Sequence, residues 1–253
     1  MKPIESGRAF QGRMELDCDV VVVGSGASGA VVACILAEAG HDVVVLEEGP
    51  YVAAADYGAM RPSESLRYAW RGAAVTVAYG LGDTPHINLT MGRVVGGSSV
   101  LTGGVCFRVP PSILHRWRTE RGIAEMTEEE LEPYYREVEE AVHVETVPEE
   151  MRSRSTQLFV LGAKRRGVEM HPMRRNTENC NGCGRCNFGC PHQAKLSVDL
   201  TYLPRAQRAG ARIVSDCLVD RITMKGDRAV GVTGRVLNGK HGKPGDELVV
   251  RAR

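Results

Sequence analysis

The feature that most constrains the fold of this chain is a glycine-rich turn between two apolar segments near the N-terminus. Residues 18–49 read CDVVVVGSGASGAVVACILAEAGHDVVVLEEG. Val20–Val23 is a β-branched run typical of a buried parallel strand, and Gly24–Gly29 matches the pattern G-x-G-x-x-G. Residues 30–39 are rich in helix formers, and Val43–Leu46 predicts a second buried strand. The segment therefore predicts one βαβ unit of the nucleotide-binding kind.

Each residue of this turn has a physical task. Gly24 permits the tight turn after the strand, Gly26 lets a pyrophosphate approach the backbone, and Gly29 lets the helix pack close to the sheet. The N–H groups and the positive dipole end of the helix then face the phosphates. Glu47 follows Gly29 by eighteen residues and is placed to accept hydrogen bonds from a ribose hydroxyl. Its charge disfavours NADP, but the pattern alone does not separate FAD from NAD.

Length and charge exclude several classes of protein. The chain has 253 residues, enough for one large domain or two small ones, and a net charge of +1 from 32 basic and 31 acidic side chains. We therefore expect no nucleic-acid partner. The first sixteen residues lack an apolar stretch of signal-peptide length, and the uncharged run 20–37 is explained by the βαβ unit. The sequence predicts a protein without a membrane span, located in the cytoplasm.

A second glycine cluster follows the βαβ unit. Residues 92–110 read GRVVGGSSVLTGGVCFRVP, with five glycines and two serines in nineteen residues. This composition predicts a loop that exposes its backbone rather than a core element. Two interpretations are open, a second place where main chain approaches a ligand and an ordinary surface loop.

These two motifs together carry a resemblance to a known family. GSGASG with LEEG at the strand end, followed by GRVVGGSS…GG…R, resembles the glucose–methanol–choline (GMC) family of FAD-dependent oxidoreductases. The segments RWRTERGIAEMTEEELEPYYREVEEAVHV and CNGCGRCNFGCPHQAKLSVDLTYLPRAQRAGARI are similar to the cysteine-bearing branch near long-chain alcohol oxidases. The resemblance covers about residues 17–253 and implies oxidation of a CH–OH donor, with hydride transfer to the flavin.

The resemblance also implies the residues that bind the cofactor. Residues of the first turn would hold the FAD pyrophosphate and Glu47 the adenosine ribose, while the second glycine cluster would lie along the flavin. Val219 in CLVDRI matches a position whose backbone meets the adenine. The residues predicted to bind FAD are Gly24, Ser25, Gly26, Ala27, Ser28, Gly29, Glu47, Glu48, Arg93, Gly97, Ser98, Ser99, Thr102, Gly103, Gly104 and Val219. Thr102 departs from the family, where asparagine is common, so its role against the flavin ring is open.

The sequence also predicts the organisation of the chain. We expect an N-terminal tail over residues 1–16 and an FAD-binding domain over residues 17–253, which includes a cysteine-rich loop at 176–195. The predicted fold class is α/β, a Rossmann-like FAD-binding βαβ domain with additional strands and helices, truncated before the substrate domain. Thr127–Val142 predicts a surface helix that begins with a capping box.

The C-terminal part predicts one helix and a series of strands. The helix is Leu200–Arg208, and the strands are Arg212–Ser215, Cys217–Met224, Ala229–Leu237 and Glu247–Ala252. Turns are predicted at Asn238-Gly239 and Lys243–Asp246.

The catalytic residues implied by the family are not found in this sequence. The family's catalytic histidine lies in its far C-terminal region, and the seven histidines match no such position. They are expected to be surface or packing residues: His41, His86, His115, His143, His171, His192 and His241. We therefore expect an N-terminal portion that is inactive alone, whose complete form acts on a small-molecule alcohol and passes electrons to oxygen, a quinone or a carrier protein. The alternatives are a non-catalytic FAD-binding fragment and a flavin and iron–sulfur electron-transfer protein.

Four of the eight cysteines form a tight cluster. Residues 180–191 read CNGCGRCNFGCP, and the spacing of Cys180, Cys183, Cys186 and Cys190 is the one that bacterial ferredoxins use for [4Fe–4S] ligation. Four interpretations stay open: an iron–sulfur cluster that relays electrons from the flavin, structural zinc, disulfides, and free thiols. The four scattered cysteines are expected to be small buried hydrophobic residues: Cys18, Cys34, Cys106 and Cys217.

Overall fold

The computed structural model of the protein describes residues 3–239 and 242–253. The contacts within the chain divide it into two compact units. The sheet unit comprises residues 1–103, 185–193 and 197–253, and the helical unit comprises residues 104–184 and 194–196.

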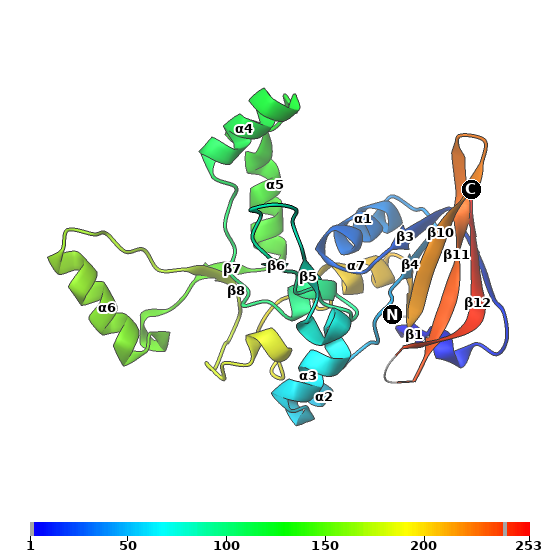
Figure 1. Cartoon of the computed structure of the whole chain (residues 1–253), viewed down its shortest axis with the longest axis horizontal. Helices are drawn as coiled ribbons and strands as arrows, with labels where there is room; N and C mark the ends of the chain where they lie inside the picture. Colours follow the sequence, from blue (N-terminus) through cyan, green and yellow to red (C-terminus); the bar gives the residue numbers. More distant parts are fainter. Residues whose placement is uncertain (1–2, 240–241) are drawn as a thin grey trace. The chain divides into compact units, whose positions relative to one another are not determined.

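The sheet unit contains a parallel sheet and a mixed sheet (Figure 1). The parallel sheet has the strand order β1-β9-β4-β3. The mixed sheet has the order β10-β11-β12-β2, in which β12 and β2 run parallel and the other pairs antiparallel. The strands are β1 (Glu5–Ser6), β2 (Met14–Cys18), β3 (Val20–Val23), β4 (Val43–Leu46), β9 (Arg212–Ser215), β10 (Cys217–Lys225), β11 (Arg228–Asn238) and β12 (Lys243–Ala252), with a short hairpin of β5 (Val77–Ala78) and β6 (Ile87–Asn88).

The helices of the sheet unit lie between its strands in the order of the chain. Helix α1 leads from β3 to β4 and packs against α7. The α-helices are α1 (Ala27–Glu38), α2 (Ala54–Ala59), α3 (Pro62–Ala69) and α7 (Tyr202–Arg208), and the 3-10 helices are η1 (Gly7–Ala9), η2 (Arg71–Ala74), η3 (Gly97–Val100) and η5 (Cys186–Phe188). The predicted βαβ unit is thus present as β3, α1 and β4, and Gly40 ends the helical segment with φ +91°.

The two strands of the βαβ unit differ in burial. All four residues of β4 are buried because the strand has a neighbour on each side, β9 and β3. Strand β3 lies at the edge of the sheet, and Val23 is 55% exposed. The prediction of a buried strand is therefore wrong for β3, since an apolar run does not show whether a strand is central or at an edge.

Side chains of both sheets form one hydrophobic cluster. Its buried members are Met14, Cys18, Val44, Leu46, Val214, Cys217, Val232, Val236, Leu248 and Val250. A second cluster includes Val94, Val100 and Leu101, which belong to the second glycine-rich segment. The prediction that this segment is not a core element is therefore only half right. Its glycines turn the backbone, and the aliphatic residues between them are buried.

The N-terminal residues and one predicted turn have a different structure from the one expected. Within the predicted tail, Glu5–Ser6 pairs with β9, and β2 starts at Met14 and pairs with β12. The predicted turn Lys243–Asp246 is instead the start of β12, where Pro244 lies opposite Leu237 next to a register shift. Proline is tolerated near the beginning of a strand, so the turn signal was misleading.

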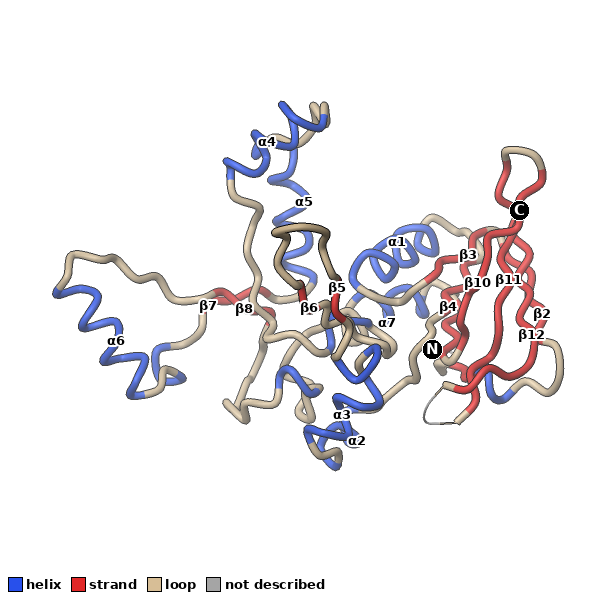
Figure 2. The backbone as a smooth tube through the Cα atoms, viewed as in Figure 1, coloured by secondary structure: helices blue, strands red, loops and turns tan. Residues whose placement is uncertain are grey.

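The helical unit has short strands and three longer helices, joined by long loops (Figure 2). Its elements are α4 (Pro111–Arg121), α5 (Glu128–Ala141), β7 (Val144–Thr146), η4 (Glu149–Met151), α6 (Arg154–Arg165) and β8 (Arg174–Asn176), with β7 and β8 antiparallel. The hydroxyl of Thr127 accepts from the N–H of Glu130 at 3.1 Å and caps α5, as the sequence predicts. The carboxylate of Glu139 joins Arg108 and Arg174, each at 2.8 Å.

Candidate functional site

The first glycine loop presents the N-terminus of α1 without a side-chain cap. Gly24 has φ +92° and donates its N–H to Leu46 O at 2.8 Å, which turns the chain away from the end of β3. Gly26 is the N-cap residue of the helix and makes no side-chain cap hydrogen bond. The amides of the first turn therefore have no side-chain cap, which is the arrangement that suits a phosphate.

Gly29 is required by the packing of this loop on itself. A Cβ atom at Gly29 would lie 2.0 Å from the carbonyl oxygen of Gly24 and 3.3 Å from a methyl group of Val22. No side chain fits there, so the helix can follow the strand this closely only with glycine at this position.

The two glycine-rich segments meet at their backbones. A Cβ atom at Gly97 would lie 2.8 Å from the Cα of Gly26, and the N–H of Gly96 donates to the Ser25 hydroxyl at 3.0 Å. A Cβ atom at Gly49 would lie 2.1 Å from the carbonyl carbon of Arg93. Glycines from both segments thus permit a main-chain contact that the sequence alone did not reveal.

Glu47 ties the first glycine loop to the end of β4. One carboxylate oxygen accepts from the N–H and the hydroxyl of Ser25, at 2.9 and 2.7 Å, and the other accepts from the N–H of Gly49 at 2.8 Å. The residue is only 6% exposed, and burial raises the pKa of its carboxyl group, while the hydrogen bonds from Ser25 and Gly49 oppose that rise. Its predicted contact with a ribose stays a prediction.

Glu48 lies between two arginines. Arg71 donates to one oxygen of its carboxylate, and Arg93 lies 4.0 Å from the other. The Glu48 side chain is 18% exposed and that of Arg93 14%, whereas Arg71 is 47% exposed. Arg71 and Arg93 therefore offset the charge of Glu48, and Glu47 adds a further carboxylate to the same region.

A cavity of about 560 Å³ lies in front of these groups. Its walls come from the glycine loops, the end of β4, the start of β10 and the segment around η2. The lining residues are Val23, Gly24, Gly26, Leu46, Glu47, Glu48, Arg71, Met91, Gly92, Gly97, Ser98, Cys217, Leu218 and Val219. Seven of the predicted cofactor residues therefore line one cavity: Gly24, Gly26, Glu47, Glu48, Gly97, Ser98 and Val219.

The remaining predicted residues lie elsewhere. Ser25 is fully buried beneath the loop, and Ala27, Ser28 and Gly29 form the first turn of α1. The hydroxyl of Ser99 donates to Gly96 O at 2.7 Å and accepts from the N–H of Val198 at 3.3 Å.

The end of the second glycine segment is different. Thr102 is exposed, and Gly103 is the last residue of this part of the sheet unit. Gly104 belongs to the helical unit, where a Cβ atom would lie 2.7 Å from the side-chain oxygen of Asn176.

Sequence reasoning missed part of the cavity wall. Cys217 and Leu218 precede the predicted Val219 on the same strand, so their position could have been inferred. Arg71 stands 23 residues from Glu48, in a segment that matches no motif, and no sequence signal pointed to it.

The four clustered cysteines are divided between the two units of the chain. Within residues 3–239 and 242–253 there is no group of three or more His, Cys, Asp or Glu side chains that could hold a metal ion. Cys180 and Cys183 belong to the helical unit, Cys186 and Cys190 to the sheet unit, and none of the four is in a disulfide. The predicted iron–sulfur cluster therefore has no support.

The other cysteines and the histidines are less informative. Cys18, Cys34 and Cys217 are buried, as predicted, and Cys106 is half-buried. Burial raises the pKa of Cys18 and Cys34 to about 11 and that of Cys217 to about 12. His241 lies outside the described residues, and the six other histidines are exposed.

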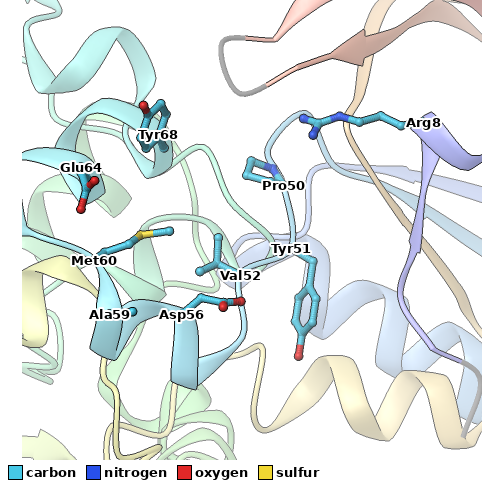
Figure 3. Close-up of a pocket in the computed structure, with 9 residues that line it drawn as sticks. All are labelled: Arg8, Pro50, Tyr51, Val52, Asp56, Ala59, Met60, Glu64 and Tyr68. Atoms are coloured by element: carbon cyan, nitrogen blue, oxygen red, sulfur yellow. The ribbon is translucent and has the colours of Figure 1, made fainter.

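Figure 3 shows a second cavity of the sheet unit, with a volume of about 410 Å³. Side chains of α2 and α3 face the chain that follows β4, and Arg8 closes another side. The lining residues are Arg8, Pro50, Tyr51, Val52, Asp56, Ala59, Met60, Glu64 and Tyr68. Arg8 is engaged with Asp216 at 2.5 Å and with Leu237 O at 2.8 Å. This cavity shares no lining residue with the glycine loops.

A helix can span a bilayer only if it is long and continuously apolar. Across residues 3–239 and 242–253, no helix is both long enough and apolar enough to span it.

A parallel sheet, a βαβ unit and a glycine turn at an uncapped helix N-terminus define a Rossmann-like α/β protein. The sequence profile of the GMC oxidoreductase family matches residues 18–252. This chain belongs to the GMC oxidoreductase family, which confirms the predicted resemblance and fold class.

Relatives agree with this assignment, and a solved structure shares the fold. An uncharacterized GMC-type oxidoreductase of Mycobacterium tuberculosis is 42% identical over 217 residues, 86% of this chain and 34% of the relative. A long-chain-alcohol oxidase of Arabidopsis thaliana is 30% identical over 93% of this chain and 32% of its own length. The crystal structure of pyridoxine 4-oxidase from Mesorbium loti superposes with a TM-score of 0.64 at 19% identity, over 92% of this chain and 48% of that one. The chain thus spans about a third of the length of the first of these relatives.

Proposed function

We propose that this chain is the FAD-binding part of an oxidoreductase that oxidises the CH–OH group of a small-molecule alcohol. The observation that carries the proposal is the cavity of about 560 Å³ at the N-terminus of α1, where the two glycine loops meet. A glycine loop, an uncapped helix N-terminus and strand-end carboxylates are together the donor and acceptor set that a dinucleotide needs.

Each wall of the cavity fits one part of FAD. The amides after Gly26 would hold the diphosphate, Glu47 and Glu48 would accept from the adenosine ribose, and the backbone at Val219 would meet the adenine. Gly97 and Ser98 would lie towards the flavin. When bound, the flavin supplies the redox chemistry by accepting the hydride that leaves the alcohol carbon, and the chain's own residues bind and orient it.

The names of relatives support an alcohol donor. Besides the long-chain-alcohol oxidase, a cholesterol oxidase of Acinetobacter baumannii is 25% identical over 244 residues. We propose that these 253 residues bind FAD without turning over alcohol, because the six described histidines are exposed and none lines the cavity. The reaction would then need a base from outside this chain. These 253 residues would by themselves be a non-catalytic FAD-binding portion.

Gly26→Ala tests the FAD site without disturbing the fold. A Cβ atom at Gly26 would be 3.9 Å from its nearest neighbour, the Cα of Gly97, and the backbone there has φ −66°. Alanine is therefore tolerated in the folded chain, but it fills the space next to the diphosphate. We expect the wild-type chain to quench FAD fluorescence on titration, and Gly26→Ala to bind FAD about tenfold or more weakly with an unchanged melting temperature.

Two outcomes would contradict the proposal. A wild-type chain that binds no FAD would remove its basis, and equal FAD affinity in Gly26→Ala would place the cofactor away from this loop. Turnover of alcohols with an artificial electron acceptor would contradict the inactivity of the chain alone.

A further inference from the structure

One residue of the cavity wall is unaccounted for by any motif. Arg71 lines the cavity beside Glu48, and Glu48 is the only residue in the described part of the chain with which its side chain hydrogen-bonds. A guanidinium group has five N–H donors and two flat faces. One carboxylate occupies a single edge of that group, so donors and a planar face remain available to a ligand.

The backbone around Arg71 holds the residue in place. Its N–H donates to Met91 O at 2.9 Å, and Trp70 pairs with Gly92 next to it. Three residues in the left-handed region follow directly, Gly72, Ala73 and Ala74, with φ of 54°, 53° and 63°. Alanine in that region costs about 1 kcal/mol or more, and such strain is concentrated at functional sites. The backbone conformation next to Arg71 is therefore maintained at a cost in folding free energy.

The location of Arg71 indicates which half of a dinucleotide it meets. It is paired with Glu48, which follows the predicted ribose acceptor Glu47, and the cavity wall there continues into Cys217–Val219. Ser98, at the expected flavin side, belongs to η3 on the second glycine loop.

We propose that Arg71, oriented by Glu48, is a cofactor-binding residue that holds the adenosine diphosphate half of FAD in the GMC cavity. The inference rests on the proposed function, because it names a contact to the same cofactor. The guanidinium donates to ribose or phosphate oxygens or stacks on the adenine, and Glu48 orients the guanidinium in addition to accepting from the ribose. The charge of Arg93 near the same carboxylate offsets that of Glu48, so the charge of Arg71 is available to the diphosphate.

The test compares three ligands: FAD, ADP and FMN. ADP contains only the half that Arg71 is proposed to hold, and FMN lacks the adenosine. In the full 253-residue chain, Arg71→Ala should raise the Kd for FAD and for ADP by the same factor, about tenfold to thirtyfold, and leave the Kd for FMN unchanged. Glu48→Gln should raise the Kd for FAD and ADP by a smaller factor, about threefold, since it frees Arg71 without removing it.

Arg235→Ala is the matched control. Arg235 is 45% exposed and pairs with one carboxylate, Asp220, at 2.9 Å, so it resembles Arg71 in exposure and partner but lies outside the cavity. Its Kd values should stay within about twofold of the wild type. Arg71→Gln keeps the Cβ and Cγ methylenes and a polar end but removes the guanidinium group. It should lose FAD affinity like Arg71→Ala, which covers the case in which alanine impairs folding.

The outcomes separate this inference from the proposed function. If the wild-type chain binds neither FAD nor ADP, the proposed function fails and the inference with it. If the wild type binds both and the Arg71 variants match Arg235→Ala, only the inference fails. Equal weakening of FMN, FAD and ADP would also overturn it, because the effect would then be on the fold of the pocket.

Discussion

The sheet unit and the helical unit of this chain are stabilised in different ways. In the sheet unit, strands of both sheets contribute aliphatic side chains to one buried cluster. In the helical unit, α5 and α6 bury none of their residues, all of which the structure describes, and α4 buries only Leu114. There the Glu139 carboxylate joins Arg108 and Arg174 instead. The cavity lined by the glycine loops therefore lies in the unit with the larger buried core.

The sharpest test of this difference is Gly29→Ala. The new methyl group would lie 2.0 Å from the Gly24 carbonyl, so either the loop or the helix must move. We expect a loss of more than about 4 kcal/mol in unfolding free energy, measured by urea denaturation. Gly26→Ala is the control in the same loop and should cost under about 1 kcal/mol. A stable Gly29→Ala protein would show that the packing of the loop is not as tight as described.

The second test removes one aliphatic side chain from each unit. Leu248 is fully buried in the shared cluster, so Leu248→Ala should lower the unfolding free energy by about 2–5 kcal/mol. Leu158 in α6 is 51% exposed, and Leu158→Ala should change the unfolding free energy by under about 0.5 kcal/mol. The comparison would be broken by equal losses in the two variants.

The third test removes the charge of Glu139, which pairs with Arg108 and Arg174 in the helical unit. The two arginines lower the pKa of Glu139 from 4.5 to about 2, so its stabilising effect is present above about pH 5 and is lost as the pH falls towards 2. Arg108 and Arg174 are each more than a third exposed, so solvent screening limits the effect. Glu139→Gln should therefore cost about 1–2 kcal/mol at pH 7 and nothing near pH 2.

Thermal unfolding of the wild type and Glu139→Gln at a series of pH values measures this difference. A difference that stays constant with pH would mean that the carboxylate stabilises the unit through packing and not through its charge.

The sequence predicted the parts of the fold that depend on near neighbours. The strands at Val20–Val23 and Val43–Leu46 and the cap at Thr127 were expected and are present, because each is specified within a few residues. The pairing of β2 with β12 was not foreseen, since Glu15 and Arg251 are 236 residues apart. The turn predicted at Lys243–Asp246 was wrong because pairing with β11 overrides a local preference.

The candidate site follows the same rule. The glycines of the first loop carry their own signature, so they could be assigned from the sequence. That Glu47 is held by Ser25 and Gly49, and that Arg71 reaches Glu48, depends on how separate segments meet. The cysteine spacing does not show which unit each thiol joins, and the predicted iron–sulfur cluster stays without support.

The parallel pairing of β2 with β12 has a consequence for how this protein is made. Ribosomes add on the order of 5–20 residues per second, so tens of seconds separate the synthesis of the two strands. During that interval the amides of β2 have no partner strand, and such open edges pair readily with other chains. Slower translation therefore lengthens the time during which β2 is unpaired and the newly made polypeptide can aggregate.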